Sequence, residues 1–381
     1  MVRFTAFPLL LFFFTFPLQA QTTGTPISMT LSGGSGTLNL DFANNDYELI
    51  LYSGQTDAAD TNRTYTYTVS TGSTLSFLNP PIYQPATSQR DHFEYLLRQK
   101  EQALAQRVQM TGWVPAAPKI ITRQQIGATR TFAFEKFGGV TSNQTVTATL
   151  VATNSRAIAY LDNALPSSEK NISTANIETM LNAFSNDTFN TITNTYGTPS
   201  DVDSDDKVIF LFTHLVDQVG GVAGFYSSGS LFATDRGGDG NIADMMFISP
   251  TRELASYTSL LAHEFQHLIS FNQHVLIQNG DAEETWLNEG LSHVAEDLVN
   301  GHIDGGNTDL VSDFMNAPEQ YALTGDASLN SGIRGAAYLF VRGLMESFGS
   351  DVPGRLVKTN KVNIANVEDI SGQTFDDVYR T

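Results

Sequence analysis

The chain has no cysteine among its 381 residues. This absence excludes a disulfide framework, a thiolate zinc site and a thiol nucleophile. Basic residues are also few, because 21 Lys and Arg stand against 40 Asp and Glu and leave a formal net charge of -19. So acidic a chain argues against nucleic acid and against anionic membrane surfaces as partners. The hydrophobic content of 41% is ordinary for a globular protein, so a sizeable core is expected.

Long apolar runs are scarce, and the one that stands out lies at the N-terminus. Residues 1–20 contain an early Arg3, an apolar run from Phe7 to Leu18, and Ala20 before a polar stretch. The run is too short for a membrane span and has the anatomy of a secretory signal peptide. We therefore expect cleavage after Ala20, no stable membrane insertion of the mature chain, and a secreted, cell-surface or periplasmic location.

The remaining chain has the patterning of an α+β protein with two domains. Residues 21–90 include "TLNLDF", "YELILYS" and "RTYTYTVS", which predict a β-rich, sandwich-like N-terminal domain. Residues 91–118 predict a helix followed by the linker "GWVPAAP", with a domain boundary near Pro118. Residues 119–381 predict a second domain with a mixed sheet and a C-terminal helical part.

This second domain contains strand and helix patterns together. The apolar runs "KVIFLF" and "ADMMFIS" are typical of buried strands, and we expect them in one mixed sheet with "TRTFAFE" and "QTVTATLVAT". Long helices are expected at 253–275 and 282–300, with the sheet behind the first and the active site in the cleft between the two. The segment "GGVAGFYSSGSLFATDRGGDGN" is rich in glycine and is expected to form a long surface loop.

The helix expected at 253–275 carries the sequence "HEFQH". His263 and His267 are four residues apart, so both imidazoles lie on one face of the helix and can reach one metal ion. Glu264 lies one step round the helix, where it can contact a water on that metal without being a ligand. This H-E-x-x-H spacing is typical of zinc hydrolases, and two structural or surface histidines are the ordinary alternative.

A catalytic zinc ion normally has three protein ligands and one open position. The helix expected at 282–300 contains "ETWLNEGLSHVAED", in which Glu289 could return to the same metal if the two helices are antiparallel. The spacing alone leaves three other third ligands open on that helix, namely His293, Glu296 and Asp297.

Together, "HEFQHLISFNQH" and "ETWLNEGLSHVAED" resemble the gluzincins, the thermolysin-like metallopeptidases, and most closely the bacterial hyicolysin-type family. The resemblance runs from about residue 130 to the end of the chain and includes "YGTPSDVDSDDKVIFLFTHL", "GVAGFY" and "ADMMFIS". It implies that His263, His267 and Glu289 bind Zn²⁺, that Glu264 is the general base, and that residues 119–381 form a zinc metallopeptidase domain. His293 departs from the family, because thermolysin-like enzymes have a carboxylate four residues after the glutamate ligand.

The function implied is a secreted metalloendopeptidase that hydrolyses polypeptides through a zinc-activated water, with Glu264 accepting the proton. A further donor would stabilise the oxyanion, and the candidates for that role are Tyr338, Tyr321, His293 and Arg334. One alternative is a catalytically silent surface or adhesion protein that retains this fold. Another is a purely structural metal site, which would have no use for a base beside the metal.

Two smaller features carry separate expectations. Asp201, Asp203 and Asp205 in "DVDSDD" alternate as ligands do in calcium loops, which makes them a candidate Ca²⁺ site. The loop lacks the glycine of an EF-hand, so a solvated acidic turn is the favoured interpretation. The C-terminal "SGQTFDDVYRT" begins as a helix capped by Thr374 and Asp377 and then stops, so we expect a chain truncated relative to the family.

Overall fold

The computed structural model describes residues 9–12, 50–53, 89–113, 125–134, 144–166, 172–325 and 330–379. The predicted signal peptide and the predicted β-rich domain lie outside these residues, except for two short segments. These are β1 (Leu9–Phe12) and β2 (Ile50–Ser53), which pair antiparallel. Both predictions therefore stay predictions. Among the described residues, no helix has the length and apolarity that crossing a membrane requires.

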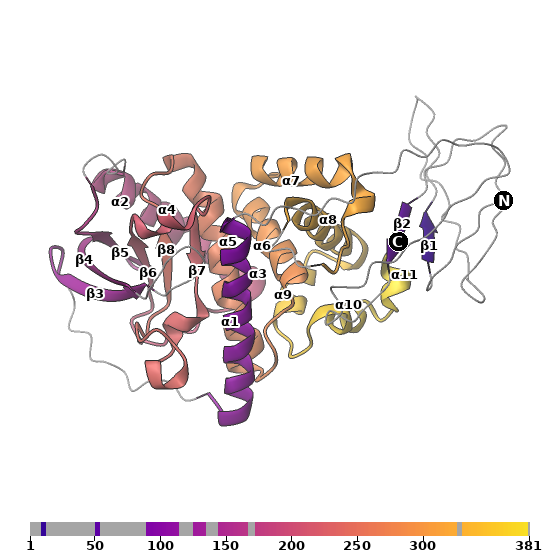
Figure 1. Cartoon of the computed structure of the whole chain (residues 1–381), viewed down its shortest axis with the longest axis horizontal. Helices are drawn as coiled ribbons and strands as arrows, with labels where there is room; N and C mark the ends of the chain where they lie inside the picture. The colour runs from indigo at the N-terminus through magenta and orange to yellow at the C-terminus, as the bar shows by residue number, and fades with distance from the viewer. Residues whose placement is uncertain are drawn as a thin grey trace.

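A mixed six-stranded sheet forms one half of the described structure (Figure 1). Its strand order is β3-β4-β5-β6-β8-β7. The central strands β5, β6 and β8 are parallel, whereas β3, β4 and the edge strand β7 pair antiparallel with their neighbours. The predicted mixed α+β architecture is thus confirmed. The strands are β3 (Thr129–Phe134), β4 (Gln144–Thr153), β5 (Ala157–Asp162), β6 (Val208–Phe212), β7 (Gly224–Tyr226) and β8 (Met245–Ile248).

Each face of the sheet is covered by its own hydrophobic core, because β6 and β8 are apolar at every position. Phe210 and Phe212 belong to the core that includes α2, α3 and α5. Ile209 and Leu211 belong to the core on the opposite face, which includes α4. These helices are α2 (Thr174–Ala183), α3 (Phe189–Tyr196), α4 (Leu215–Val219) and α5 (Tyr257–Phe271), with a π-helical turn, Phe184–Thr188, joining α2 to α3.

Helix α1 (Gln89–Thr111) contributes to both cores. Phe93 and Leu97 pack in the core that holds α4, and Leu104 and Val108 pack in the core that holds α5. The helix predicted at the start of residues 91–118 is therefore confirmed, and it packs against the sheet. The linker from residue 114 onward lies outside the described residues, so the boundary near Pro118 stays a prediction.

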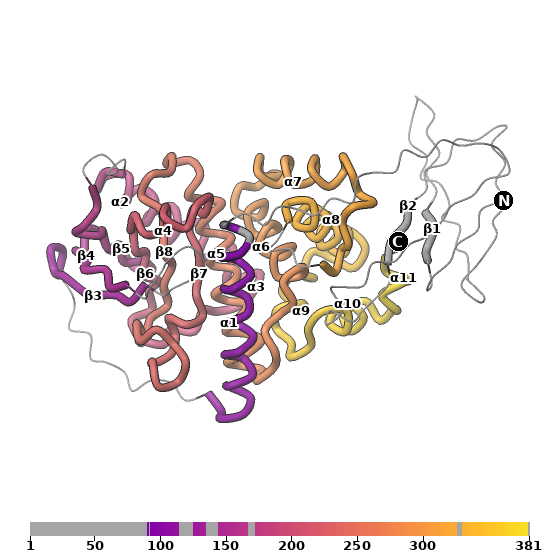
Figure 2. Tube along the Cα trace, viewed as in Figure 1, coloured from indigo at the N-terminus to yellow at the C-terminus, as the bar shows by residue number. Residues whose placement is uncertain are grey.

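The other half of the described structure is helical, and the chain can be followed through it in Figure 2. Helix α6 packs against α5 and α8, and α7 packs against α8. Asp304 and Asn330 cap α7 and α8 by accepting hydrogen bonds from backbone N–H groups. The helices are α6 (Thr285–Asn300), α7 (Gly305–Asn316), α8 (Ser331–Phe348), α9 (Val352–Val357), α10 (Asn363–Ser371) and α11 (Phe375–Tyr379). The predicted cap of α11 is present, since Thr374 Oγ1 lies 2.6 Å from Asp377 Oδ2.

One loop prediction is wrong, and another is wrong in part. The glycine-rich segment was expected at the surface, yet it contains the edge strand β7 and a buried 3₁₀ turn, Ser228–Leu231. It is buried because β7 pairs with β8, which takes its backbone polar groups into the sheet. The acidic turn was expected to be solvated, which is true of the exposed Ser204 and Asp206 but not of Asp203, whose fractional exposure is 5%.

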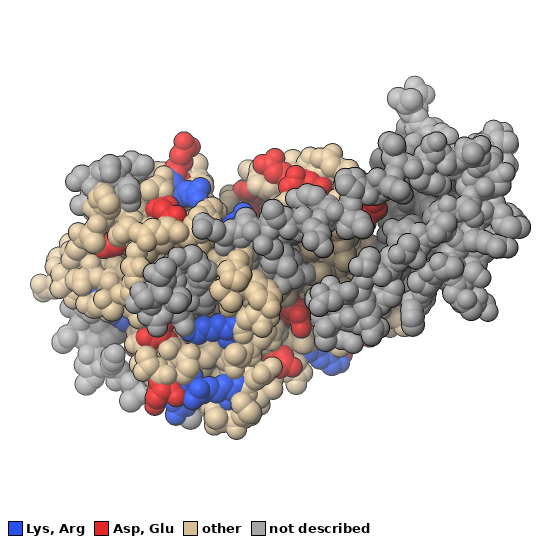
Figure 3. Space-filling view, in the orientation of Figure 1, with Lys and Arg blue, Asp and Glu red and all other residues tan. Residues whose placement is uncertain are grey.

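Charged side chains are dispersed over the face shown in Figure 3, with Asp and Glu gathered over α7. The acidity of the chain therefore forms no single continuous field on that face of the described structure.

Candidate metal centre

Helix α5 contains the "HEFQH" sequence, and all five of these residues are buried. Leu261, Phe265 and Leu268 pack into the core, with fractional exposures of 1% or less. This packing fixes the helix against the sheet, so His263 and His267 leave it in a set direction toward α6. The helix continues as a π-helical turn, Asn272–Ile277, which ends the segment that was predicted to be helical to residue 275.

Three side chains from α5 and α6 converge on one point. The Nε2 atoms of His263 and His267 are 3.2 Å apart. Carboxylate oxygens of Glu289 lie 3.5 Å from His263 Nε2 and 3.6 Å from His267 Nε2. All three donor atoms lie within 4.8 Å of one another. The structure thus places His263, His267 and Glu289 side by side and packs α5 against α6, as the sequence pattern predicted. Their role as zinc ligands stays a prediction.

The donor set fits a zinc ion. Two imidazole nitrogens and one carboxylate are ligands that catalytic zinc sites use. Glu289 is 1% exposed, and neither of its carboxylate oxygens accepts a hydrogen bond. A buried carboxylate without hydrogen bonds is costly unless a cation compensates its charge. These residues therefore suit a bound metal better than they suit a packed core.

Arginine supplies part of that compensation. Arg334 of α8 places Nη1 3.1 Å from Glu289 Oε2, and its Nη2 lies 3.9 Å from Glu94 Oε1 of α1. Although burial acts to raise the pKa of Glu289, Arg334 and the two histidines hold it well below its usual range. Gly290 permits this approach of α6 to α8, because a Cβ at that position would lie 2.7 Å from the carbonyl oxygen of Ala337.

Glu264 points to the edge of the sheet. Its Oε2 accepts a hydrogen bond of 2.8 Å from the backbone N–H of Tyr226 in β7. Burial raises the pKa of Glu264 to about 7, and the neighbouring His263 opposes that rise. The hydrogen bond therefore holds the Glu264 carboxylate next to the metal-binding group but not as a member of it. The sequence gives no signal for this contact of Tyr226, because it uses a main-chain N–H of the glycine-rich segment and no particular side chain.

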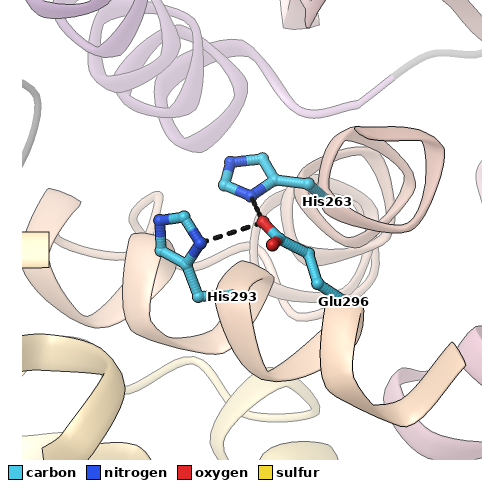
Figure 4. A group of neighbouring side chains, drawn as sticks. All are labelled: His263, His293 and Glu296. Atoms are coloured by element: carbon cyan, nitrogen blue, oxygen red, sulfur yellow. Dashed lines mark hydrogen bonds and ion pairs between the residues drawn. The ribbon is translucent and has the colours of Figure 1, made fainter. Parts of the chain in front are cut away.

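Glu296 positions one of the two histidines, and its role was not anticipated (Figure 4). Its Oε1 lies 2.7 Å from His263 Nδ1 and 2.9 Å from His293 Nδ1, so both rings point at one oxygen. Burial raises the pKa of Glu296, but His293 and the hydrogen bonds from both rings outweigh it and lower the pKa to about 2. An ionised Glu296 leaves His263 Nε2 free to face His267 and Glu289. The carboxylate that contacts His263 thus lies seven residues after Glu289, whereas a histidine stands four residues after it.

Asp297, the remaining alternative ligand, faces away from the metal centre. Its Oδ2 accepts hydrogen bonds from Tyr338 at 2.7 Å and from Arg342 at 2.8 Å. Its Oδ1 accepts bonds from the backbone N–H of Asp304 and from Asn307. Asp297 therefore connects α6 to α7 and α8 through these hydrogen bonds and stabilises their packing.

The four candidates for the oxyanion donor differ in the contacts that their side chains make. Tyr338 donates its hydroxyl to Asp297, and Arg334 is paired with Glu289. Tyr321 packs beside Gly332, where a Cβ would lie 2.4 Å from its ring. His293 keeps its Nε2 buried without a hydrogen-bond partner, and its ring centroid lies 4.8 Å from that of His263. His293 is therefore the candidate that has a nitrogen still available beside the ligands.

Replacing Glu296 tests its positioning role. We expect Glu296→Gln to lower zinc affinity by about 10-fold to 100-fold, because removing a partner that orients a ligating histidine has costs of this size. Competition with a chromophoric zinc chelator measures the affinity, and the exposed Glu319→Gln is the matched control. A loss as large as that caused by His263→Ala would mean that Glu296 binds the metal itself.

No protein-family model matches the chain. No curated protein has significant sequence similarity to it. Among solved structures, the M1 zinc metallopeptidase from Deinococcus radiodurans is 12% identical with a TM-score of 0.37, and the match covers 67% of this chain and 60% of that one.

Two further solved structures are similar at the same level. A mutant M1 zinc metallopeptidase from Deinococcus radiodurans, bound to a Tyr-Ser-Ala substrate, has 12% identity and a TM-score of 0.36 over 67% of this chain and 61% of that one. A two-domain M1 zinc metallopeptidase mutant bound to L-tryptophan has 12% identity and a TM-score of 0.35 over 66% and 50%. This chain thus matches between 50% and 61% of the length of these three structures. The resemblance of the motif residues to the hyicolysin-type family stays a prediction.

Proposed function

We propose that the chain is a zinc-dependent metalloendopeptidase of the gluzincin kind, similar to the hyicolysin-type enzymes, that acts on polypeptides outside the cytoplasm. One observation carries the proposal. His263, His267 and Glu289 present three donor atoms to one point, while Glu264 stands beside them with its carboxylate held by a main-chain N–H. A structural metal site needs the first three residues but gains nothing from the fourth.

In this proposal the roles divide among the residues of α5 and α6. Zinc, when bound, supplies a Lewis acid and an activated water at neutral pH. His263, His267 and Glu289 hold the ion, and Glu296 fixes the ring orientation of His263. Three protein ligands would leave the fourth position of a tetrahedral zinc ion open to water.

Glu264 carries the proton transfers. Its carboxylate accepts a proton as water adds to the peptide carbonyl, and it returns that proton to the leaving amine. The N–H of Tyr226 keeps Oε2 in place, which leaves Oε1 to face the reacting water. His293 Nε2 is our candidate for the group that stabilises the oxyanion, since the other three candidates have competing contacts.

The activity test uses the intact chain and an unfolded polypeptide substrate. We expect hydrolysis that 1,10-phenanthroline abolishes and that added zinc restores, because the reaction depends on a removable ion. Hydrolysis that survives complete removal of zinc would contradict the proposal. A chain that retains one zinc ion and cleaves no polypeptide would favour a silent surface or adhesion protein that retains the fold.

A further inference from the structure

The acidic turn before β6 brings three alternating carboxylates together. Ligand atoms of Asp201, Asp203 and Asp205 all lie within 4.8 Å of one another. The backbone curls here, because Asp201, Ser204 and Asp206 have φ values of 49°, 57° and 58°. Asp201 Oδ1 accepts the N–H groups of Asp205 and Asp206, both at 2.9 Å, which closes the turn.

Asp203 is the unusual member of this group. It is 5% exposed, and neither of its carboxylate oxygens has a hydrogen-bond partner. Burial of a carboxylate without partners costs several kcal/mol in general, so folded proteins rarely retain one unless a cation is bound or the group is protonated. This orphaned side chain is an observation separate from the spacing of the aspartates.

The groups around Asp203 add negative charge. Burial raises its pKa to about 8, and the carboxylates of Asp205 and Asp244 contribute to that rise. Asp244 itself accepts hydrogen bonds from Ser200 and from the N–H of Val202. A site that concentrates carboxylates in this way attracts a cation.

The nearby basic side chains are directed elsewhere. Lys207 donates to Thr153 Oγ1 at 3.1 Å, and Arg130 donates to the carbonyl oxygen of Asn241 at 2.8 Å. Arg130 acts on Asp203 electrostatically, but within the described part of the chain neither basic side chain makes a hydrogen bond to it. The compensating charge must therefore come from a proton or from an ion.

We propose that Asp201, Asp203 and Asp205 bind a calcium ion. All three ligands are carboxylate oxygens. Such a set suits hard cations better than zinc or copper, which prefer nitrogen and sulfur ligands. Ca²⁺ accepts oxygen ligands at about 2.3–2.6 Å in a flexible arrangement, so two ligands on opposite sides are at most about 5 Å apart, whereas Mg²⁺ requires a tighter octahedron. Three carboxylate oxygens within 4.8 Å of one another can share one such ion.

The calcium ion would stabilise the support of the metal centre without taking part in catalysis. The carbonyl oxygen of Thr198, just before the turn, accepts hydrogen bonds from Asn272 and Gln273 at 2.8 and 3.1 Å. These two residues belong to the π-helical turn that continues α5. The turn also leads directly into β6, a central strand of the sheet. Calcium therefore connects the sheet to the end of the helix that holds His263 and His267.

The test measures calcium binding and thermal unfolding on the intact chain loaded with zinc. Isothermal titration with CaCl₂ should show one site, and calcium at 100-fold excess over Kd should raise Tm by about 5 °C or more. MgCl₂ at the same ionic strength should give a much smaller shift. Equal shifts from both salts would overturn the assignment to calcium, and no heat and no shift up to about 10 mM CaCl₂ would overturn the site.

Two variants place the ion at these residues. Asp203→Asn should abolish calcium binding, and without calcium its Tm should be no lower than that of the parent, because a neutral carboxamide needs no compensating proton or ion at this buried position. Asp205→Asn should weaken binding as an independent check. The exposed Asp206→Asn, which changes the same net charge in the same turn, should bind calcium as the parent does. Unchanged binding by Asp203→Asn would contradict the proposal.

Discussion

Glu264→Gln is expected to lower kcat for polypeptide hydrolysis by about 100-fold to 10,000-fold, the range that loss of a general base produces. The carboxamide cannot accept the proton from water, yet its oxygen can still accept the N–H of Tyr226 that now binds Oε2 at 2.8 Å. The fold and the zinc content should therefore be unchanged. Steady-state hydrolysis and metal analysis on the same preparation measure both quantities.

Glu253→Gln is the matched control for this experiment, because Glu253 is exposed and lies just before α5. It removes the same charge and should retain full activity. If Glu264→Gln hydrolyses the substrate at the parental rate, the assigned mechanism is wrong, whatever metal is bound.

Glu289→Gln is expected to reduce zinc affinity by more than about 100-fold, because loss of a ligand must exceed the loss caused by a residue that only orients one. The variant keeps the shape of the side chain but removes the negative charge that faces both histidines and Arg334. Competition with a chromophoric chelator gives the zinc dissociation constant, and activity at limiting zinc should fall with it.

Glu346→Gln provides the comparison, since Glu346 is an exposed residue of α8. Its zinc affinity should equal that of the parent. An unchanged affinity in Glu289→Gln would move the third ligand to another residue of α6, and the pair His293 and Glu296 would then be the first to examine.

Much of the fold follows from residues that need no tertiary information. The runs that became β6 and β8 are apolar at every position, which predicts strands buried on both faces. His263 and His267 share a helix face because of their spacing alone, and the apolar neighbours of that helix predict its burial. These features are local, so a pattern in the sequence can determine them.

The parts that sequence reasoning missed depend on contacts between distant segments. Glu296 and His293 lie on the same face of α6 as Glu289, and only the packing of α5 against α6 decides which of them reaches the ion and which reaches His263 Nδ1. Strand β7 is three residues long and begins with Gly224, so its pairing with β8 leaves little local signal. Asp203 resembles any surface aspartate in the sequence, and only the fold shows that it is buried with Asp244 near it.

Helix α1 shows the same limit on a larger scale. Its sequence predicts a helix and gives no sign that Glu94 approaches Arg334 or that Phe93 packs on Phe225 of β7 at a ring separation of 4.8 Å. The helix was assigned to a connecting region because a proline-rich segment follows it. These two contacts depend on residues that lie more than a hundred positions later in the chain.

The central claim is a zinc ion with three protein ligands and one open position, and crystallographic anomalous scattering at the zinc edge tests it most directly. We predict one strong peak bonded to the Nε2 atoms of His263 and His267 and to the carboxylate of Glu289, with a water as the fourth ligand and Glu264 beside it. A peak enclosed by four protein ligands, or one located between His293 and Glu296, would contradict the account.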